Sequence, residues 1–96
     1  MVAVPVNDPL GAGLVRVRDG CMAPRVPAGA WVRVDPRRTP QPGDVVLAVI
    51  DDQLAVRALV EWAGRRWLTA THGSAPVPVD PDAEIRGVVT RVLPSL

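Results

Sequence analysis

Short segments in which apolar and polar residues alternate run along most of the chain. Val15 and Val17 alternate with Arg16 and Arg18, and the same two-residue period returns in residues 31–35. Because successive side chains of a strand point to opposite faces, this period predicts strands with one buried face. The pattern therefore favours a succession of short strands over helices.

Four more segments are typical of strands. Residues 44–50 are continuously apolar after the first position, as expected of a strand buried on both faces. In residues 53–61 every second side chain is apolar, which predicts one buried face. That face consists of Leu54, Val56, Ala58 and Val60. Residues 66–70 and the long segment 83–93 complete the set.

The segments between these strands are rich in proline, glycine and aspartate. Residues 1–13 show little periodicity, and we expect an irregular arm there. Pro24 and Pro27 limit residues 21–24 to a single helical turn. Residues 71–82 are interpreted as a loop. No repeat or linker divides residues 14–96, so the sequence predicts one compact, mainly β domain of largely antiparallel strands, arranged as a small barrel or as two packed sheets.

The amino-acid composition of the chain reduces the number of function classes to consider. The 96 residues carry a net charge of +1, and all eleven basic residues are arginines scattered among ten acids, which does not favour nucleic-acid binding. Cys21 is the sole cysteine, so a reducing, cytoplasmic location is expected. The longest apolar run, residues 45–50, is too short to span a bilayer, and residues 1–10 do not resemble a secretory signal. No metal or cofactor is expected.

Several segments resemble a known family when they are taken in order. Residues 17–24 read Val-Arg-Asp-Gly-Cys-Met-Ala-Pro, and residues 42–48 read Pro-Gly-Asp-Val-Val-Leu-Ala before Leu54-Ala55-Val56-Arg57-Ala58-Leu59. Their spacing resembles the LexA/UmuD family of self-cleaving serine peptidase domains, which includes phage repressor C-terminal domains and is related in fold to type I signal peptidases. Residues 68–79 and 85–89 resemble the later loop and closing strand of the same family.

The resemblance implies a β peptidase fold with an altered catalytic dyad. In the family a serine attacks the peptide carbonyl while a buried, neutral lysine takes its proton. Those two positions hold Cys21 and Arg57 here, and the chain contains no lysine. Arginine keeps its proton at any ordinary pH and is therefore no base. Met22 is the neighbour of the nucleophile in the oxyanion loop, and Ala55 replaces a residue that often orients the lysine.

The remaining chemistry has two interpretations. Cys21 is either a nucleophile whose thiolate is favoured by Arg57 or a small filler in a decayed site. His72 is either the general acid or a solvated loop residue, and Arg57 itself could be only a surface charge. An active chain would be a Cys21-dependent endopeptidase or autopeptidase. Ala12–Gly13, the only Ala-Gly pair before Cys21, is expected to lie too close to fold back into the site.

The leading hypothesis is a catalytically inactive domain used for dimerisation or another protein contact, linked to SOS-type regulation in a bacterium or phage. Family members dimerise partly through their C-terminal strands, and residues 83–93, if unpaired at an edge, would invite a second copy. The chain is expected to be a minimal stand-alone domain or part of something longer. A less favoured alternative is a barrel that binds single-stranded nucleic acid. Its stacking platform would be Trp31, Trp62 and Trp67, which we interpret instead as core or interface anchors.

Overall fold

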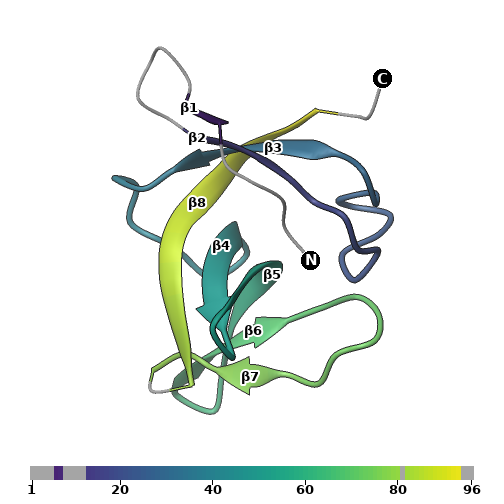
Figure 1. The fold of residues 1–96 in the computed structure, drawn as a ribbon. Helices are drawn as coiled ribbons and strands as arrows, with labels where there is room; N and C mark the ends of the chain where they lie inside the picture. The colour runs from purple at the N-terminus through teal and green to yellow at the C-terminus, as the bar shows by residue number, and fades with distance from the viewer. Residues whose placement is uncertain (1–5, 8–12, 81, 94–96) are drawn as a thin grey trace.

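The computed structural model describes residues 6–7, 13–80 and 82–93. These residues form eight strands in one antiparallel sheet (Figure 1), whose order is β1-β2-β3-β8-β4-β5-β6-β7. The strands are β1 (Val6–Asn7), β2 (Gly13–Arg16), β3 (Trp31–Asp35), β4 (Val45–Ile50), β5 (Gln53–Trp62), β6 (Arg65–Thr69), β7 (Val77–Pro78) and β8 (Ala83–Leu93). The predicted mainly β, single-domain fold is confirmed.

The alternating pattern located the longer strands to within about two residues, and it missed the two shortest. Strand β1 lies in the predicted irregular arm, and β7 lies in the predicted loop. The other positions of the arm, residues 1–5 and 8–12, are outside the described residues. The predicted helical turn at residues 21–24 is a series of turns instead. In the part of the chain that the structure describes, no helix has the length and hydrophobicity needed to cross a bilayer.

Strand β8 joins the two halves of the sheet. Its first half pairs with β4 from Ala83 to Val88, and its second half pairs with β3 from Val88 to Leu93. Figure 1 shows the strand running from the region of β4 to that of β3. Strand β8 as a whole therefore does not meet the condition of an unpaired edge strand, because a neighbour lies on each side. Among the described residues, each half is nevertheless paired with a strand on one side only.

The sheet folds over itself and encloses two clusters of buried side chains. One cluster draws on β2, β3, β4 and β5, and the other on β4, β5, β6 and β8. Val45 and Leu47 enter the first cluster, while Val46 and Ala48 enter the second. Strand β4 is thus buried on both faces, as its continuous apolar run predicted.

Strand β5 differs from the prediction of a single buried face. Val56 is buried in the first cluster, with Leu54 and Ala58 partly buried against it, yet Leu59 on the opposite face is fully buried in the second cluster. Ala55 on that opposite face is also buried. A strand ten residues long passes both clusters, so alternation in sequence does not reveal its second buried face.

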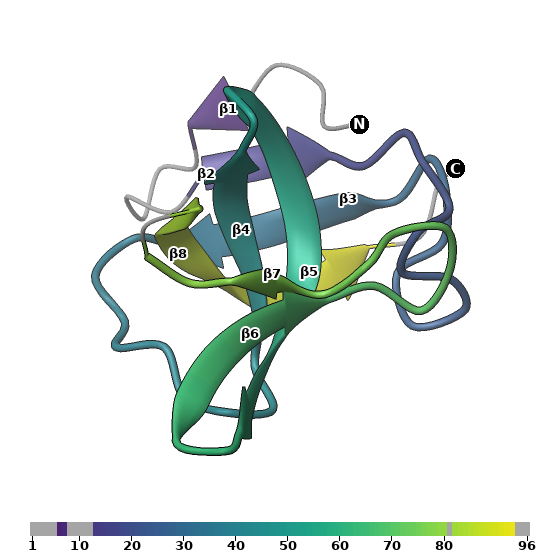
Figure 2. The same ribbon diagram turned by 90° about the horizontal axis from the view of Figure 1, so that it is seen from below.

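No aromatic residue belongs to the buried core of the described chain, which consists of valine, alanine, leucine and methionine. Trp31 and Trp67 are half-buried, and Trp62 is 71% exposed at the tip of the β5–β6 hairpin. Figure 2 shows this hairpin extending away from the rest of the sheet. The interpretation of the tryptophans as core residues is therefore wrong. Their roles as interface anchors or, less favoured, as a stacking platform stay predictions.

Candidate functional site

Cys21 lies in a compact turn between β2 and β3. The turn is closed by backbone hydrogen bonds: the amide of Ala23 donates to the Gly20 carbonyl (3.1 Å), and that of Val26 donates to the Met22 carbonyl (2.8 Å). At its base, the amide of Val17 donates to the Ala30 carbonyl (2.8 Å). Cys21 itself is half-buried. These bonds hold the cysteine backbone in one position at the edge of the first core cluster.

Met22 anchors the turn. Its side chain is 2% exposed and packs in the first core cluster. Burying a methionine side chain stabilises a fold by about 1.5–3 kcal/mol. Met22 therefore has a packing role in the structure. The sequence predicts only its place beside the nucleophile position.

The backbone amide of Cys21 already has a hydrogen-bond acceptor. It donates to the Asp19 carboxylate, with 3.2 Å between nitrogen and Oδ1. Aspartate side chains commonly accept a bond from the amide two residues later, because the short side chain mimics a backbone turn. Sequence reasoning overlooked Asp19 as a participant in the site, although its spacing from Cys21 was the available signal.

Arg57 lies on β5 and is half-buried. Its guanidinium Nη1 donates a 2.8 Å hydrogen bond to the carbonyl of its own neighbour, Val56. The side chain lines a groove of about 480 Å³, between β5 and a wall that includes Ser74 and Ala75 of the β6–β7 connection and Val77 of β7. Ala55 lines the same groove, so the two positions that the resemblance associates with the catalytic base are side by side.

The loop that carries His72 reaches the cysteine turn through its backbone. The amide of His72 donates to the Cys21 carbonyl (2.9 Å), whereas the His72 side chain is exposed. Figure 2 shows this loop between β6 and β7. Its further residues Ser74 and Ala75 form the wall of the groove that faces Arg57.

The structure thus places the three predicted site residues around one loop without joining their side chains. Cys21 contacts the loop at His72, and Arg57 faces it at Ser74 and Ala75. Among the described residues, the Cys21 sulfur has no hydrogen bond to the Arg57 guanidinium or to the His72 ring. Their assignment to a catalytic site stays a prediction.

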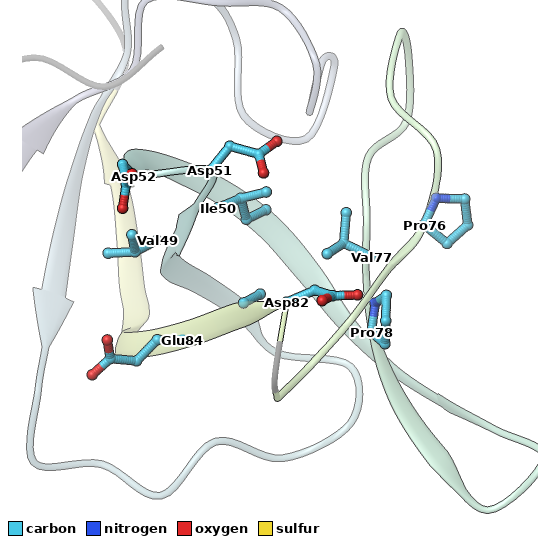
Figure 3. Close-up of a pocket in the computed structure, with 10 residues that line it drawn as sticks. Val49, Ile50, Asp51, Asp52, Pro76, Val77, Pro78, Asp82 and Glu84 are labelled. Atoms are coloured by element: carbon cyan, nitrogen blue, oxygen red, sulfur yellow. The ribbon is translucent and has the colours of Figure 1, made fainter.

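A second hollow, of about 600 Å³, lies on the other side of Val77 and contains none of the predicted site residues. Four carboxylates line it, from two segments, the β4–β5 turn and residues 82–84, and they point in different directions, as Figure 3 shows. They belong to Asp51, Asp52, Asp82 and Glu84. Within the described ranges, no three acidic, histidine or cysteine side chains are arranged to hold a metal ion. Sequence reasoning missed this acidic hollow because its acidic residues are up to 33 positions apart, from 51 to 84.

Two comparisons with known proteins agree with this fold and with the sequence motifs. The chain matches the model of the Peptidase S24-like family over residues 2–90. It is also similar to a LexA repressor of Clavibacter sepedonicus, with 32% identity over 68 residues. That match covers 71% of this chain and 30% of the repressor, so the chain spans about a third of the length of this relative. On the strength of the family match and the β fold, the chain belongs to the Peptidase S24-like family.

Proposed function

We propose that this chain is a non-catalytic member of the Peptidase S24-like family that acts as a dimerisation or protein-interaction module. The proposal rests on the arginine at position 57, which the resemblance assigns to the catalytic base. A guanidinium stays charged, and the chain of 96 residues contains no lysine to replace it. Arg57 donates a hydrogen bond to the Val56 carbonyl, as a permanent cation can, and a protonated guanidinium has no lone pair with which to accept a proton.

The backbone around Cys21 also supports an inactive site. Peptide cleavage passes through an oxyanion that backbone amides stabilise. The amide of Cys21, which the resemblance assigns to the nucleophile position, donates to the Asp19 carboxylate, so it is engaged before any substrate binds. A carboxylate at that place would also repel a developing negative charge.

The second half of β8 supports pairing with another copy of the chain. From Val89 to Leu93 it pairs with β3, while its pairing with β4 ends at Val88. The opposite edge of this half therefore has no strand partner in the described part of the molecule. Open edges are templates for a further strand, and a two-fold dimer would pair β8 with its copy.

A regulatory setting is inferred from relatives. The chain is similar to part of a protein named LexA repressor, and its motifs resemble LexA/UmuD-type domains. We accordingly place the proposed module in SOS-type regulation in the cytoplasm of a bacterium or in a phage-encoded system. Its contacts would be with proteins and not directly with nucleic acid.

Mass spectrometry tests the absence of catalysis. The chain and its Cys21→Ala variant are incubated at mildly alkaline pH, where about half of an ordinary thiol is ionised, alone and with a mixture of extended peptides. Unchanged masses of both proteins and of all peptides are expected. Peptide-bond cleavage by the chain that disappears in Cys21→Ala would instead establish a cysteine peptidase and contradict the proposal.

A further inference from the structure

Strand β5 has an open edge beside Arg57. It pairs with β4 along Gln53–Ala58, but β6 pairs with it only from Ala58 onward. No strand that the structure describes pairs with the other side of residues 53–57. The groove of about 480 Å³ runs along this side, with Ser74 and Ala75 on its far wall.

The backbone amides and carbonyls of Leu54 and Val56 point toward the open side of β5. Leu59 exchanges hydrogen bonds with Gly43 and Asp44 on the β4 side, at 2.7 and 2.8 Å. Because orientation alternates along a strand, Leu54 and Val56 direct their amides and carbonyls the other way. The Val56 carbonyl accordingly accepts its bond from Arg57 on the open side. Apart from the Val56 carbonyl, which Arg57 occupies, the edge offers the amide and carbonyl of Leu54 and the amide of Val56 to an extended chain, over about 10 Å at about 3.3 Å per residue.

The groove is closed at the Arg57 end. From Ala58 onward, β6 occupies the same side of β5, and the Thr69 hydroxyl donates to the Ala58 carbonyl (3.4 Å). A strand added along Leu54–Val56 has no place to continue past Arg57. At the other end, Asp51 and Gln53 border an entrance. An added chain must therefore end near Arg57.

Arg57 determines which chain end fits. Its guanidinium uses one donor on Val56 and forms no ion pair with any residue that the structure describes. Four N–H donors are left, and a guanidinium binds carboxylate in a two-bond arrangement. A cation at the closed end attracts a carboxyl terminus and repels an amino terminus.

We propose that this groove binds the free carboxyl terminus of an extended peptide, which adds to β5 in the parallel direction with its terminal carboxylate on Arg57. Ile50, Leu54 and Val77 give the lining an apolar part beside its polar residues, so apolar residues are expected among those before the terminus. The inference rests on the non-catalytic function proposed above and gives it a partner class, a protein with an accessible carboxyl terminus. The terminal carboxylate, and not an acidic side chain, is the group recognised.

Retention on the immobilised chain tests the proposal. The probes are N-acetylated hexapeptides of mixed alanine, valine, leucine and serine, with free carboxyl termini, and the same mixture as carboxamides. Loss of a charge-assisted hydrogen bond weakens binding by about tenfold. We therefore expect the free-carboxylate mixture to be enriched by about tenfold over the amides. Arg57→Gln should abolish this preference, and Arg57→Lys should retain part of it.

Two controls make the result specific. Arg38→Gln removes the same charge from the exposed β3–β4 connection and should leave the preference unchanged. Carboxamides that contain aspartate should bind no better than the other amides. The inference is overturned by equal retention of acids and amides, by no retention of either, by an unchanged preference in Arg57→Gln, or by equal binding of aspartate-containing amides. Peptides recovered cleaved would refute the non-catalytic function itself, whereas intact but unselected peptides would refute this inference alone.

Discussion

The chemistry of position 57 depends on side-chain type more than on geometry. A lysine in a half-buried place lowers its pKa and becomes a base, whereas an arginine keeps its charge and seeks acceptors. Arg57 finds one in the Val56 carbonyl. The same place on β5 therefore favours proton transfer with lysine and carboxylate binding with arginine.

Asp35 allows a prediction about pH at the residue scale. The amide of Arg37 donates to Asp35 Oδ1 (2.9 Å), and the guanidinium adds a 3.4 Å contact, so the pKa of this carboxyl lies below its ordinary value of 3.8. A carboxyl group whose pKa is lower in the folded state than in the unfolded state stabilises the fold at pH values above the unfolded-state pKa. This stabilisation is lost as the pH falls through the folded-state pKa. We expect the melting temperature of the chain to exceed that of Asp35→Asn at pH 7. This difference should shrink as the pH falls below 3.8. A difference in melting temperature that is the same at pH 7 and pH 2.5 would contradict this.

At the scale of elements, the bend of β8 decides how the two halves of the sheet meet. Gly87 pairs with Leu47 on β4 and lies close to β3, where a Cβ atom added to it would be 2.5 Å from Val34 Cγ1 and 3.2 Å from the Asp35 carbonyl oxygen. The close approach explains a glycine within an otherwise valine-rich strand. It also gives a physical reason for Gly87 in residues 85–89, the segment that resembles the closing strand of the family.

Gly87→Ala should therefore destabilise the fold. Inserting a methyl group into a packed contact costs about 1–3 kcal/mol, since neighbouring side chains and backbone must shift. Urea unfolding of the variant should show a loss of this size. Gly13→Ala on β2 is the matched control, because its added Cβ meets nothing within 4 Å, and a change below about 0.5 kcal/mol is expected. Equal unfolding free energies for Gly87→Ala and the unaltered chain would show that the contact is not tight.

At the scale of the whole molecule, a small domain gains burial by association. Chains near this size bury only about 60–65% of their unfolded surface. The open edge of residues 89–93 and the exposed Trp62 lie on different parts of the sheet, so each could serve a separate contact. The edge is the part that a two-fold dimer would use.

Light scattering at micromolar concentrations tests this association. We expect the chain to be a dimer and Thr90→Pro to be a monomer, because proline lacks the amide needed for pairing. Thr90 is exposed and has no partner in the register with β3, so the fold should tolerate the change. Thr90→Val, which also loses the hydroxyl bond to the Arg33 carbonyl (3.4 Å), should stay dimeric. A monomer for the unaltered chain over the whole range would rule out the proposed dimer.

Local patterns in the sequence determined most of the strands. Alternation located β2, β3 and β5, and the continuous apolar run of β4 predicted its two buried faces, because side-chain direction follows from strand geometry alone. The family motifs likewise predicted the peptidase fold, and the absence of lysine is a property of composition. These features depend on neighbouring residues and need no knowledge of distant contacts.

Other features were decided only by the tertiary structure. The two-residue strands β1 and β7 are too short for a pattern and are defined by the strands they pair with. The position of β8 between β3 and β4, the second buried face of β5, and the open edge beside Arg57 all depend on which segments meet in space. Sequence patterns record which side of a strand is apolar, but pairing across distant segments determines which strand edges are left open, and in this chain both proposed contacts use such edges.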